Sequence, residues 1–476
     1  MALSSQGIGS GLDVNSIVSQ LVAIEKQPLQ QLQTKAATLQ AQVSLYGTVK
    51  SQASALGDIA ATLAISSSWN VQKASSANAE AVGVTLGTSS TASSLSVQVQ
   101  QLASTQTAAS AGVNAGDAVG ATGTLTIQLG SWAGATNALE FSASVTPSVD
   151  VSIDAADTTA TIASKINAAN AGVTATVLRD GANERLVIRS SATGEAGGFS
   201  VTSAGDAGLA QFEVKGTIDS TNSAPASGMY MSQVAQNAQV KINGVSVSSA
   251  SNKMTDVVPG VTLQLSQVTT TPVEITIEND LTAIQKNIQS FVDAYNAMSQ
   301  TLAGATKYDA TSKTGGPLQG DSTTLGLQSA LRSILGSSSE GSTFSRLSDI
   351  GLERQTDGTL KVNATKLTTA LGDLDNLKTL FTKNNNDAVT NGFGLKVRDF
   401  ARGLVAFDGR VSNKTTALQG AISRNSKDQD RVNDRATRVE ADLRRQYGAL
   451  DTQMAKWNGL SSYVNAQLAQ WNKTSS

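Results

Sequence analysis

The chain has 476 residues, a length that corresponds as a soft prior to about three domains. It contains no cysteine and no histidine, which excludes disulfides, thiolate metal sites, cysteine nucleophiles and histidine-based acid–base chemistry. Aromatic residues make up 4% and charged residues 15%, and the net charge is only −2. No global field therefore attracts nucleic acid or an anionic membrane.

The N-terminal stretch raises the question of a phosphate-binding loop, because three glycines alternate before an apolar run, at Gly7, Gly9 and Gly11. A dinucleotide fingerprint needs a preceding strand, and the stretch also lacks the Gly-Lys-Ser/Thr ending of a P-loop. We therefore interpret it as a flexible leader before a short helix through Ile24, capped by Asp13 or Asn15.

No Lys or Arg precedes Lys26, unlike an ordinary secretory signal, and no stretch reaches the length of a bilayer span. The sequence thus predicts no membrane insertion, and either a cytoplasmic protein or export by a different route.

Both ends of the chain have helical periodicity. Apolar residues recur every three or four positions through 29–63, with one stutter, and Pro28 fits the first turn of that helix. Near the C-terminus a strict four-three alternation predicts a coiled-coil seam formed by Val432, Ala436, Val439, Leu443, Gln446, Leu450, Gln453, Trp457, Leu460, Val464, Gln467 and Trp471. The glutamines weaken association, so we expect the terminal helices to be loose in the monomer and to order within an assembly.

Charged residues are expected to support the C-terminal helix through opposite-charge pairs four residues apart. These pairs are Arg424–Asp428, Asp434–Arg438, Arg438–Asp442 and Glu440–Arg444. The arginines between Arg410 and Arg445 alternate with acidic residues, which is typical of a salt-bridged helix surface rather than of a nucleic-acid interface.

The middle of the chain alternates apolar and polar residues as half-buried strands do. Strands are predicted in "LSVQVQQLA" and "GTLTIQLG", and at 173–178 and 185–190 with a turn at Asp180–Gly181. A further hairpin turns at Asn243–Gly244, and two more strands follow in "PGVTLQLSQVTTTPVEITIEND".

Helical periodicity returns after these strands. One apolar face recurs from Leu281 to Leu302, "LSDIGLERQTDGTLKVN" indicates a helix-to-hairpin passage turning at Asp357–Gly358, and "FGLKVRDFARGLV" is helical again. The simplest architecture is an α+β, nested, multidomain fold. The terminal helices pair as a coiled coil, and β domains are inserted in the middle.

Candidate chemical sites are few and weak. Acidic residues cluster at Asp150–Asp154–Asp157, Asp373–Asp375 and Asp428–Asp430, but none of these clusters has the spacing of a calcium loop. We interpret them as solvated turns or helix faces. We predict no catalytic residue, no metal site and no cofactor, and therefore a structural or assembly protein rather than an enzyme.

The motifs resemble those of the flagellar hook-associated protein 2 family, the filament cap proteins. "GIGSGLDVNSIVSQLVAIEKQPLQQLQ" resembles the family's N-terminus, and "TIASKINAANAGVTATVLRDGANERLVIRSS" looks like the flagellin-hook inserted motif. "VKINGVSVSSASNKMTDVVPGVTLQL" resembles the start of its C-terminal region. Typical stretches follow in "IQSFVDAYNAMSQTLAGATKYD", "GPLQGDSTTLGLQSALRSIL" and "LSDIGLERQTDGTLKVNATKLTTAL".

The resemblance implies a structural protein at the distal tip of the bacterial flagellar filament. It implies a homo-oligomeric ring that retains exported flagellin and promotes its folding and insertion, with no cofactor. Implied partners are flagellin, the hook-filament junction protein and a cytoplasmic export chaperone that engages 430–471. The chain would be secreted through the flagellar type III channel without a cleaved signal peptide.

By this resemblance, residues 1–45 and 415–476 form a terminal coiled-coil leg domain, and 46–72 with 281–410 form a helical domain. Residues 75–108 with 233–280 form an inner β domain, and 109–232 form an outer one. The seam and assembly residues would be Leu32, Leu39, Val43, Val439, Leu443, Leu450, Trp457, Leu460 and Val464.

Two alternatives stay open at this point. The chain could instead be another flagellar axial protein, of the flagellin or hook-filament junction type. It could also be a surface adhesin that binds host glycans through its β domains, a role compatible with capping.

Overall fold

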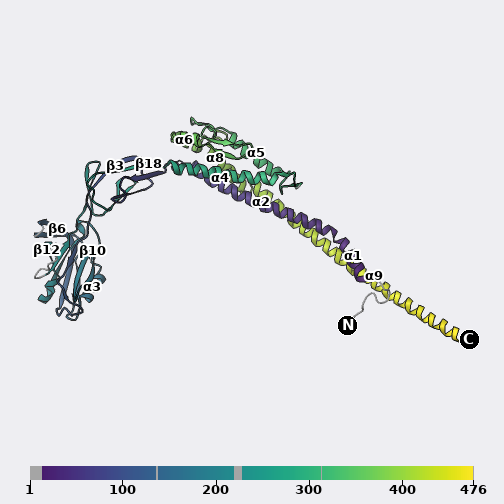
Figure 1. The fold of residues 1–476 in the computed structure, drawn as a ribbon, viewed down its shortest axis with the longest axis horizontal. Coiled ribbons are helices and arrows are strands. Elements are labelled where there is room, and N and C mark those ends of the chain that lie inside the picture. The colour runs from purple at the N-terminus through teal and green to yellow at the C-terminus, as the bar shows by residue number, and fades with distance from the viewer. Residues whose placement is uncertain (1–12, 136–137, 219–227, 312, 475–476) are drawn as a thin grey trace. The chain divides into compact units, whose positions relative to one another are not determined.

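The computed structural model describes residues 13–135, 138–218, 228–311 and 313–474. The glycines at the start of the chain lie outside the described residues. The chain divides into a helical unit, Met1–Asn70 with Leu281–Ser476, and an inserted unit, Val71–Asp280 (Figure 1). The nested, multidomain α+β fold class is therefore confirmed.

The helical unit is built from long helices joined by short turns and hairpins. Its helices are α1 (Val14–Glu25), α2 (Gln27–Ala64), α4 (Leu281–Thr306), α5 (Ser322–Gly336), α6 (Ala364–Leu371), α7 (Leu374–Thr382), α8 (Phe393–Val405) and α9 (Arg410–Thr474). Two small hairpins connect them, β19–β20 (Tyr308–Asp309 and Thr314–Gly315) and β21–β22 (Leu352–Arg354 and Leu360–Val362). The 3-10 turn η1 (Ser66–Trp69) ends the N-terminal half.

Local sequence signals set the helix ends. The Asp13 carboxylate accepts a hydrogen bond from the Ser16 N–H at 2.9 Å and so caps α1, and Pro28 lies in the first turn of α2, both as predicted. The expected helix before the β21–β22 hairpin is wrong, because 347–351 form turns. The Asp349 carboxylate accepts from the backbone of Ser345 and Arg346 there, and these bonds replace the helical ones.

One large core holds the helical unit together. The apolar face predicted on α4 is buried at Ile284, Ile288, Phe291, Val292, Tyr295, Met298 and Leu302, whereas Leu281 is 39% exposed. It packs with the second half of α2 and with α5–α8 in one hydrophobic cluster. At the crossing of α2 and α8, a side chain at Gly57 would place its Cβ only 2.9 Å from the Cβ of Ala401. Glycine is therefore needed for this close approach.

The inserted unit contains two hydrophobic clusters. The first is made by a sheet in the order β1-β18-β3-β14-β15 and a sheet in the order β16-β17-β2. Their strands are β1 (Gln72–Ser76), β2 (Val82–Leu86), β3 (Ser93–Gln101), β14 (Ala238–Ile242), β15 (Val245–Ser249), β16 (Lys253–Val258), β17 (Val261–Leu265) and β18 (Val273–Asn279). The β14–β15 hairpin turns at Asn243–Gly244 as predicted, with φ of 49° and 84° at these two residues.

The second cluster is enclosed by a sheet in the order β12-β13-β4-β10-β5, with β9 on β10, and a sheet in the order β11-β6-β7, with β8 on β6. Its elements are β4 (Thr107–Ala109), β5 (Val113–Asn114), β6 (Gly123–Ala135), β7 (Ala138–Ala143), β8 (Val149–Ile153), α3 (Thr159–Ala168), β9 (Val173–Asp180), β10 (Asn183–Ser190), η2 (Glu195–Gly197), β11 (Gly198–Gly205), η3 (Ala207–Phe212), β12 (Val214–Ile218) and β13 (Met229–Gln233). The β9–β10 hairpin confirms the predicted turn at Asp180–Gly181.

Replacing Gly57 with alanine is expected to lower the free energy of unfolding by about 1–3 kcal/mol, because the Ala401 methyl group cannot rotate away from the new one. The matched variant is Gly47→Ala on the same helix, where a new Cβ meets no atom within 4 Å. It is expected to raise the free energy of unfolding by about 0.5–1 kcal/mol through helix propensity. Urea unfolding of the full chain measures both, and equal stability of the two variants would contradict the close approach.

Candidate assembly site on the paired terminal helices

The two ends of the chain meet through α1 and α9. Val14, Val18 and Val22 share one face of α1 because they are four residues apart, and all three are buried. On α9 they pack against buried Ala436 and against Leu443 and Tyr447, which are half-buried. The contact forms a small cluster of its own, separate from the large core of the helical unit.

Two polar contacts fix the direction of this pair. The guanidinium of Arg435 lies 3.0 Å from the carboxylate of Glu25, and that of Arg444 donates to the Asn15 side-chain oxygen at 3.0 Å. The later residue of α1 therefore pairs with the earlier residue of α9, so the two helices run antiparallel. Exposed pairs of this kind add little stability, but they set the register of the apolar contact.

The first half of α2 also lies along α9 (Figure 1). Pro28 and Leu32 on α2 face Val432 and Arg435 on α9 across an open groove of about 510 Å³. Farther along α2, Leu39 and Val43 are half-buried against the large core rather than against the α1 contact. Of the predicted seam residues, Leu32 thus faces α9, while Leu39 and Val43 contribute to the helical core.

A polar network connects α2, α5 and the start of α9. The Tyr46 hydroxyl donates to Asp321 at 2.6 Å and lies 2.9 Å from the Thr324 hydroxyl, and Lys414 pairs with Asp321 at 2.6 Å. Asp321 also caps α5 by accepting from the Thr324 N–H at 2.9 Å. Burial alone would raise the pKa of Asp321, but hydrogen bonds from Lys414, Tyr46 and Thr324 outweigh it and lower the pKa to about 2. The same burial and hydrogen bond raise the pKa of Tyr46.

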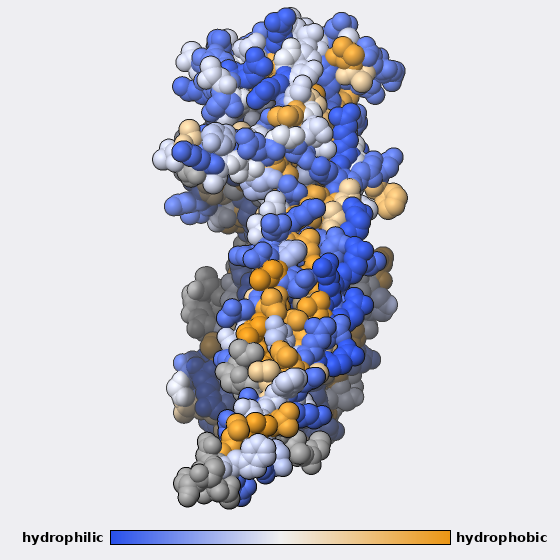
Figure 2. All heavy atoms as spheres, turned by 90° about the vertical axis from the view of Figure 1, so that its right-hand side faces the viewer, coloured by the Kyte–Doolittle hydropathy of each residue, from blue (hydrophilic) through white to orange (hydrophobic). Residues whose placement is uncertain are grey.

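The C-terminal part of α9 carries an exposed apolar stripe. Val439 is half-buried like Leu443, but beyond Tyr447 the predicted seam is open to solvent, with Leu450 45%, Trp457 64%, Leu460 58% and Val464 47% exposed. Met454, Leu468 and Trp471 continue the same face. Figure 2 shows apolar residues gathered in a broken stripe on the side that carries the C-terminal end of the helix.

The charge pairs along α9 differ from those expected. Glu440 and Arg444 form the predicted pair at 2.9 Å, but among the described residues the other three predicted pairs are absent. Asp428 pairs instead with Arg431 and Asp442 with Arg445, each three residues on. Residues three apart and residues four apart are both neighbours on a helix surface, so the sequence alone did not decide which acidic residue each arginine would pair with.

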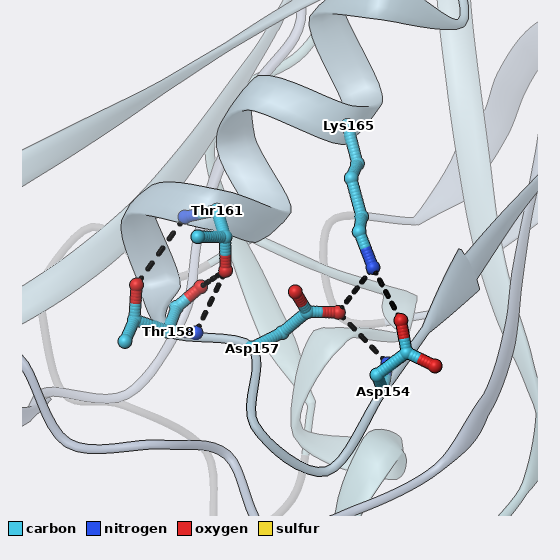
Figure 3. Close-up of polar contacts among 5 residues, drawn as sticks. All are labelled: Asp154, Asp157, Thr158, Thr161 and Lys165. Atoms are coloured by element: carbon cyan, nitrogen blue, oxygen red, sulfur yellow. Dashed lines mark hydrogen bonds and ion pairs between the residues drawn. The ribbon is translucent and has the colours of Figure 1, made fainter.

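The acidic cluster in the inserted unit is a solvated turn only in part, because Asp150 and Asp154 are exposed as predicted but Asp157 is buried. Asp157 is 8% exposed and pairs with Lys165 at 2.5 Å, and Lys165 also contacts Asp154 at 2.9 Å (Figure 3). Burial opposes ionisation of Asp157, but hydrogen bonds from the Asp154 N–H and from Lys165 hold its pKa below the usual range. Together with the Thr158–Thr161 capping box, this network fixes the start of α3. Within the described ranges, no group of three or more metal-binding side chains is present.

The sequence of this chain is similar to those of known flagellar proteins. Models of the flagellar hook-associated protein 2 N-terminus and C-terminus match residues 10–106 and 235–459, and the flagellin hook IN motif matches 138–192. The flagellar hook-associated protein 2 of Escherichia coli O157:H7 is 30% identical over 98% of both chains. The A-type protein of that name from Pseudomonas aeruginosa is 29% identical over 97% of this chain and 96% of its own.

This chain belongs to the flagellar hook-associated protein 2 family. A crystal structure of the D1-D2-D3 domains of the flagellar cap protein FliD from Escherichia coli is similar to it, with a TM-score of 0.58 and 27% identity over 79% of this chain and 99% of that one. The family assigned from sequence motifs is therefore confirmed. As in the sequence, no helix among the described residues is long and apolar enough to cross a bilayer.

Several contacts of the site were missed at the sequence level. The stretch "GDSTTLG" contains a recognisable cap signal at Asp321, but nothing in the sequence marks Tyr46 and Lys414 as its partners. Tyr46 lies 275 residues before Asp321, and Lys414 follows Asp321 on a different helix, α9. The Glu25–Arg435 pair likewise joins two helices whose register the periodicity did not give. Long-range pairing of this kind is visible only in the folded chain.

The Asp321 network predicts a pH-dependent contribution to stability. Because the pKa of Asp321 falls from 3.8 to about 2 on folding, the network stabilises the fold fully above pH 4 and loses this effect as the pH falls toward 2. Asp321→Asn keeps a capping side chain but removes the charge. It is expected to lower the free energy of unfolding by about 2 kcal/mol at pH 7 and by much less at pH 2.5, measured by urea unfolding. A deficit that is the same at both pH values would contradict this account.

The α1–α9 contact predicts local release without global unfolding. Val18→Asp places a charge in the small cluster, so hydrogen exchange of the amides of 14–25 is expected to accelerate at least about tenfold. The unfolding midpoint of the large core is expected to stay unchanged, since that core is a separate cluster. Ser19→Asp, at an exposed position of the same helix, is the matched control and should leave exchange as in the wild type. Equal protection in both variants would show that α1 does not depend on this contact.

Proposed function

We propose that this chain is the cap of the bacterial flagellar filament and that it assembles as a ring of identical copies at the distal tip. The observation that carries the proposal is the apolar stripe from Leu450 to Trp471 on α9, in a member of a family whose solved relative is named a flagellar cap protein. An exposed apolar stripe on a long helix is typical of an assembly surface.

In this proposal the ring retains exported flagellin and promotes its folding and insertion. The chain supplies surfaces and no covalent step, which agrees with a family of structural proteins and with a chain that contains no histidine or cysteine. The paired helices of 1–45 and 415–476 are the leg domain, with 46–72 and 281–410 as the helical domain beside them. Residues 75–108 with 233–280, and 109–232, are the inner and outer β domains.

The seam residues have different parts in this proposal. Leu32, Val439 and Leu443 hold the legs within one copy, whereas Leu39 and Val43 join α2 to the helical core, which agrees with their half-buried positions. Leu450, Trp457, Leu460 and Val464 contact other proteins of the assembly, which agrees with their exposure. Flagellin and the hook-filament junction protein are the proposed neighbours. The export chaperone is proposed to bind 430–471 before export to the filament tip without a cleaved signal peptide.

The alternatives are less well supported. The family match covers both terminal regions and does not favour a flagellin or a hook-filament junction protein. Adhesion through the β domains is compatible with capping, but no described feature of the inserted unit points to a glycan.

Polar substitutions in the apolar stripe test the proposal. Trp457→Gln with Val464→Gln is expected to leave unfolding of the chain unchanged, because both residues are exposed, and to abolish ring formation. In a strain that lacks its own cap protein, we expect swimming to fall to about a tenth of the wild-type level or less, since one aromatic anchor alone changes association about tenfold or more. Electron microscopy of the purified chain and motility assays provide the two measurements.

The matched control is Ala455→Gln with Ala466→Gln, which lies on the opposite face of α9 by helical periodicity and is also exposed. It should form rings and restore swimming. If the Trp457 and Val464 variant assembled and swam like this control, the stripe would not be the assembly surface.

A further inference from the structure

A pocket of about 340 Å³ lies in the helical unit between α5, the loop that joins α7 to α8, and the first turns of α8. Its walls are mainly apolar, with Ile334 from α5, Val389 from the loop and Phe400 from α8. This volume falls within the range of roughly 300–1,000 Å³ that is usual for binding pockets in proteins. The loop is ordered by its own hydrogen bonds, including Asn385 N–H to the Asn391 side chain at 2.7 Å and Val389 N–H to the Asp387 carboxylate at 2.9 Å.

A buried cation lies in this pocket. Lys396 is 8% exposed, and its ammonium group donates to the Ser338 carbonyl at 2.6 Å and to the Ser337 hydroxyl at 2.9 Å. An ammonium group has three N–H donors, so one is left. Among the described residues no carboxylate lies within 4.0 Å of it: Asp399, which also lines the pocket, pairs with Arg398 at 2.7 Å. Asp387 interacts with Lys396 only over a longer range, and burial lowers the pKa of the lysine.

An uncompensated buried cation normally finds a negative partner, since its charge is costly to hold in an apolar site. The pocket is therefore suited to a group that combines an apolar side chain with a carboxylate. The ammonium nitrogen of Lys396 lies 5.0 Å from the centre of the Phe393 ring, which offers only a weak cation–π attraction.

The same chain presents such a group at the other end of α8. Phe407, in the turn between α8 and α9, is 99% exposed, and the exposed Asp408 follows it. Within the described part of the chain, the Asp408 carboxylate accepts no hydrogen bond. The turn itself is ordered: the Gly409 N–H donates to Ala406 at 2.9 Å, and the Asn413 side chain donates to the Asp408 carbonyl at 2.8 Å. A rigid turn that exposes an aromatic side chain is pre-organised for binding.

We propose that Phe407 and Asp408 of one copy of this chain insert into the Lys396 pocket of a neighbouring copy. The Phe407 ring would occupy the apolar part of the pocket, and the Asp408 carboxylate would accept the remaining N–H of Lys396. The full exposure of Phe407 shows that it does not occupy the pocket of its own copy.

The contact is heterologous, because the inserted turn and the receiving pocket are different surfaces of the same chain. Contacts of this kind generate closed rings when the rotation between copies closes. The inference thus rests on the proposed ring and gives it a specific contact in the helical unit, separate from the stripe on α9.

Crosslinking tests the contact directly, because the chain has no cysteine of its own. Two single variants, Phe407→Cys and Val389→Cys, are mixed as dilute full-length chains, concentrated, and treated with a short bismaleimide. One of them carries a tag, so that the mixed pair is identified by its mass. Because both substitutions weaken the contact, the chains are concentrated well above ten times the half-maximal assembly concentration of the wild type, where we expect a mixed pair to form. The control replaces Val389→Cys by Tyr308→Cys, an exposed aromatic position of the same unit, and should give no pair.

Substitutions measure how much Phe407 and Asp408 contribute to the free energy of assembly. Phe407→Ser should raise the concentration for half-maximal assembly at least about tenfold, as for an aromatic anchor, while Tyr308→Ser should not change it. Asp408→Asn should raise it about two- to fivefold, and this effect should vanish in the Lys396→Met background, where its partner is gone. Asp408 is exposed, so its variant tests the pairing even if Lys396→Met is poorly folded.

The results separate this inference from the proposed function. If the wild-type chain forms rings but the Phe407 and Val389 variants give no mixed pair, or Phe407→Ser assembles normally, the contact is wrong and the cap proposal stands. If the wild-type chain forms no rings under any condition that supports filament growth, the ring proposal fails and this contact fails with it.

Discussion

The antiparallel contact between α1 and α9 is the interaction on which the terminal part of the molecule depends. It brings together segments that are more than four hundred residues apart in the chain, as the Arg444–Asn15 bond with its separation of 429 shows. Loop-closure entropy grows only slowly with chain length, so such a contact is tolerated when the large core of α2 and α4–α8 already holds the two ends in one unit. Most of the entropy cost of bringing the two ends of the chain together is thus already offset by the large core, and the small valine cluster only completes the pairing of α1 with α9.

The polar network of Tyr46, Asp321 and Lys414 has a complementary part. It lies where α2 and α9 leave the large core, and it connects both helices to the capped end of α5. Buried polar groups that are fully hydrogen-bonded specify one arrangement more strongly than apolar contacts do, because a shifted register leaves them unsatisfied. The network therefore fixes the point from which the terminal helices extend, whereas the apolar residues along them supply the less specific attraction.

Much of the fold could be predicted from local patterns, and most of the contacts that could not are long-range. Pro28, the Asp13 cap, the α4 face and the turns at Asp180–Gly181 and Asn243–Gly244 follow from periodicity and turn chemistry within a few residues. The partner of Asp157 was missed, although Lys165 is only eight residues away, because an acidic cluster by itself does not show which side chain folds back onto it. The family was readable from motif order. The register of α1 on α9 and the burial of Lys396 were not, since both depend on which helices become neighbours.

The small size of the valine cluster has a consequence for the N-terminal end of the chain. The buried residues of this cluster are only Val14, Val18, Val22 and Ala436, whereas the large core of the helical unit is a separate cluster with many more members. Because so little apolar surface holds α1, we expect it to open before the rest of the helical unit. Extension of α1 would therefore not require the large core to unfold first, since the two clusters are separate.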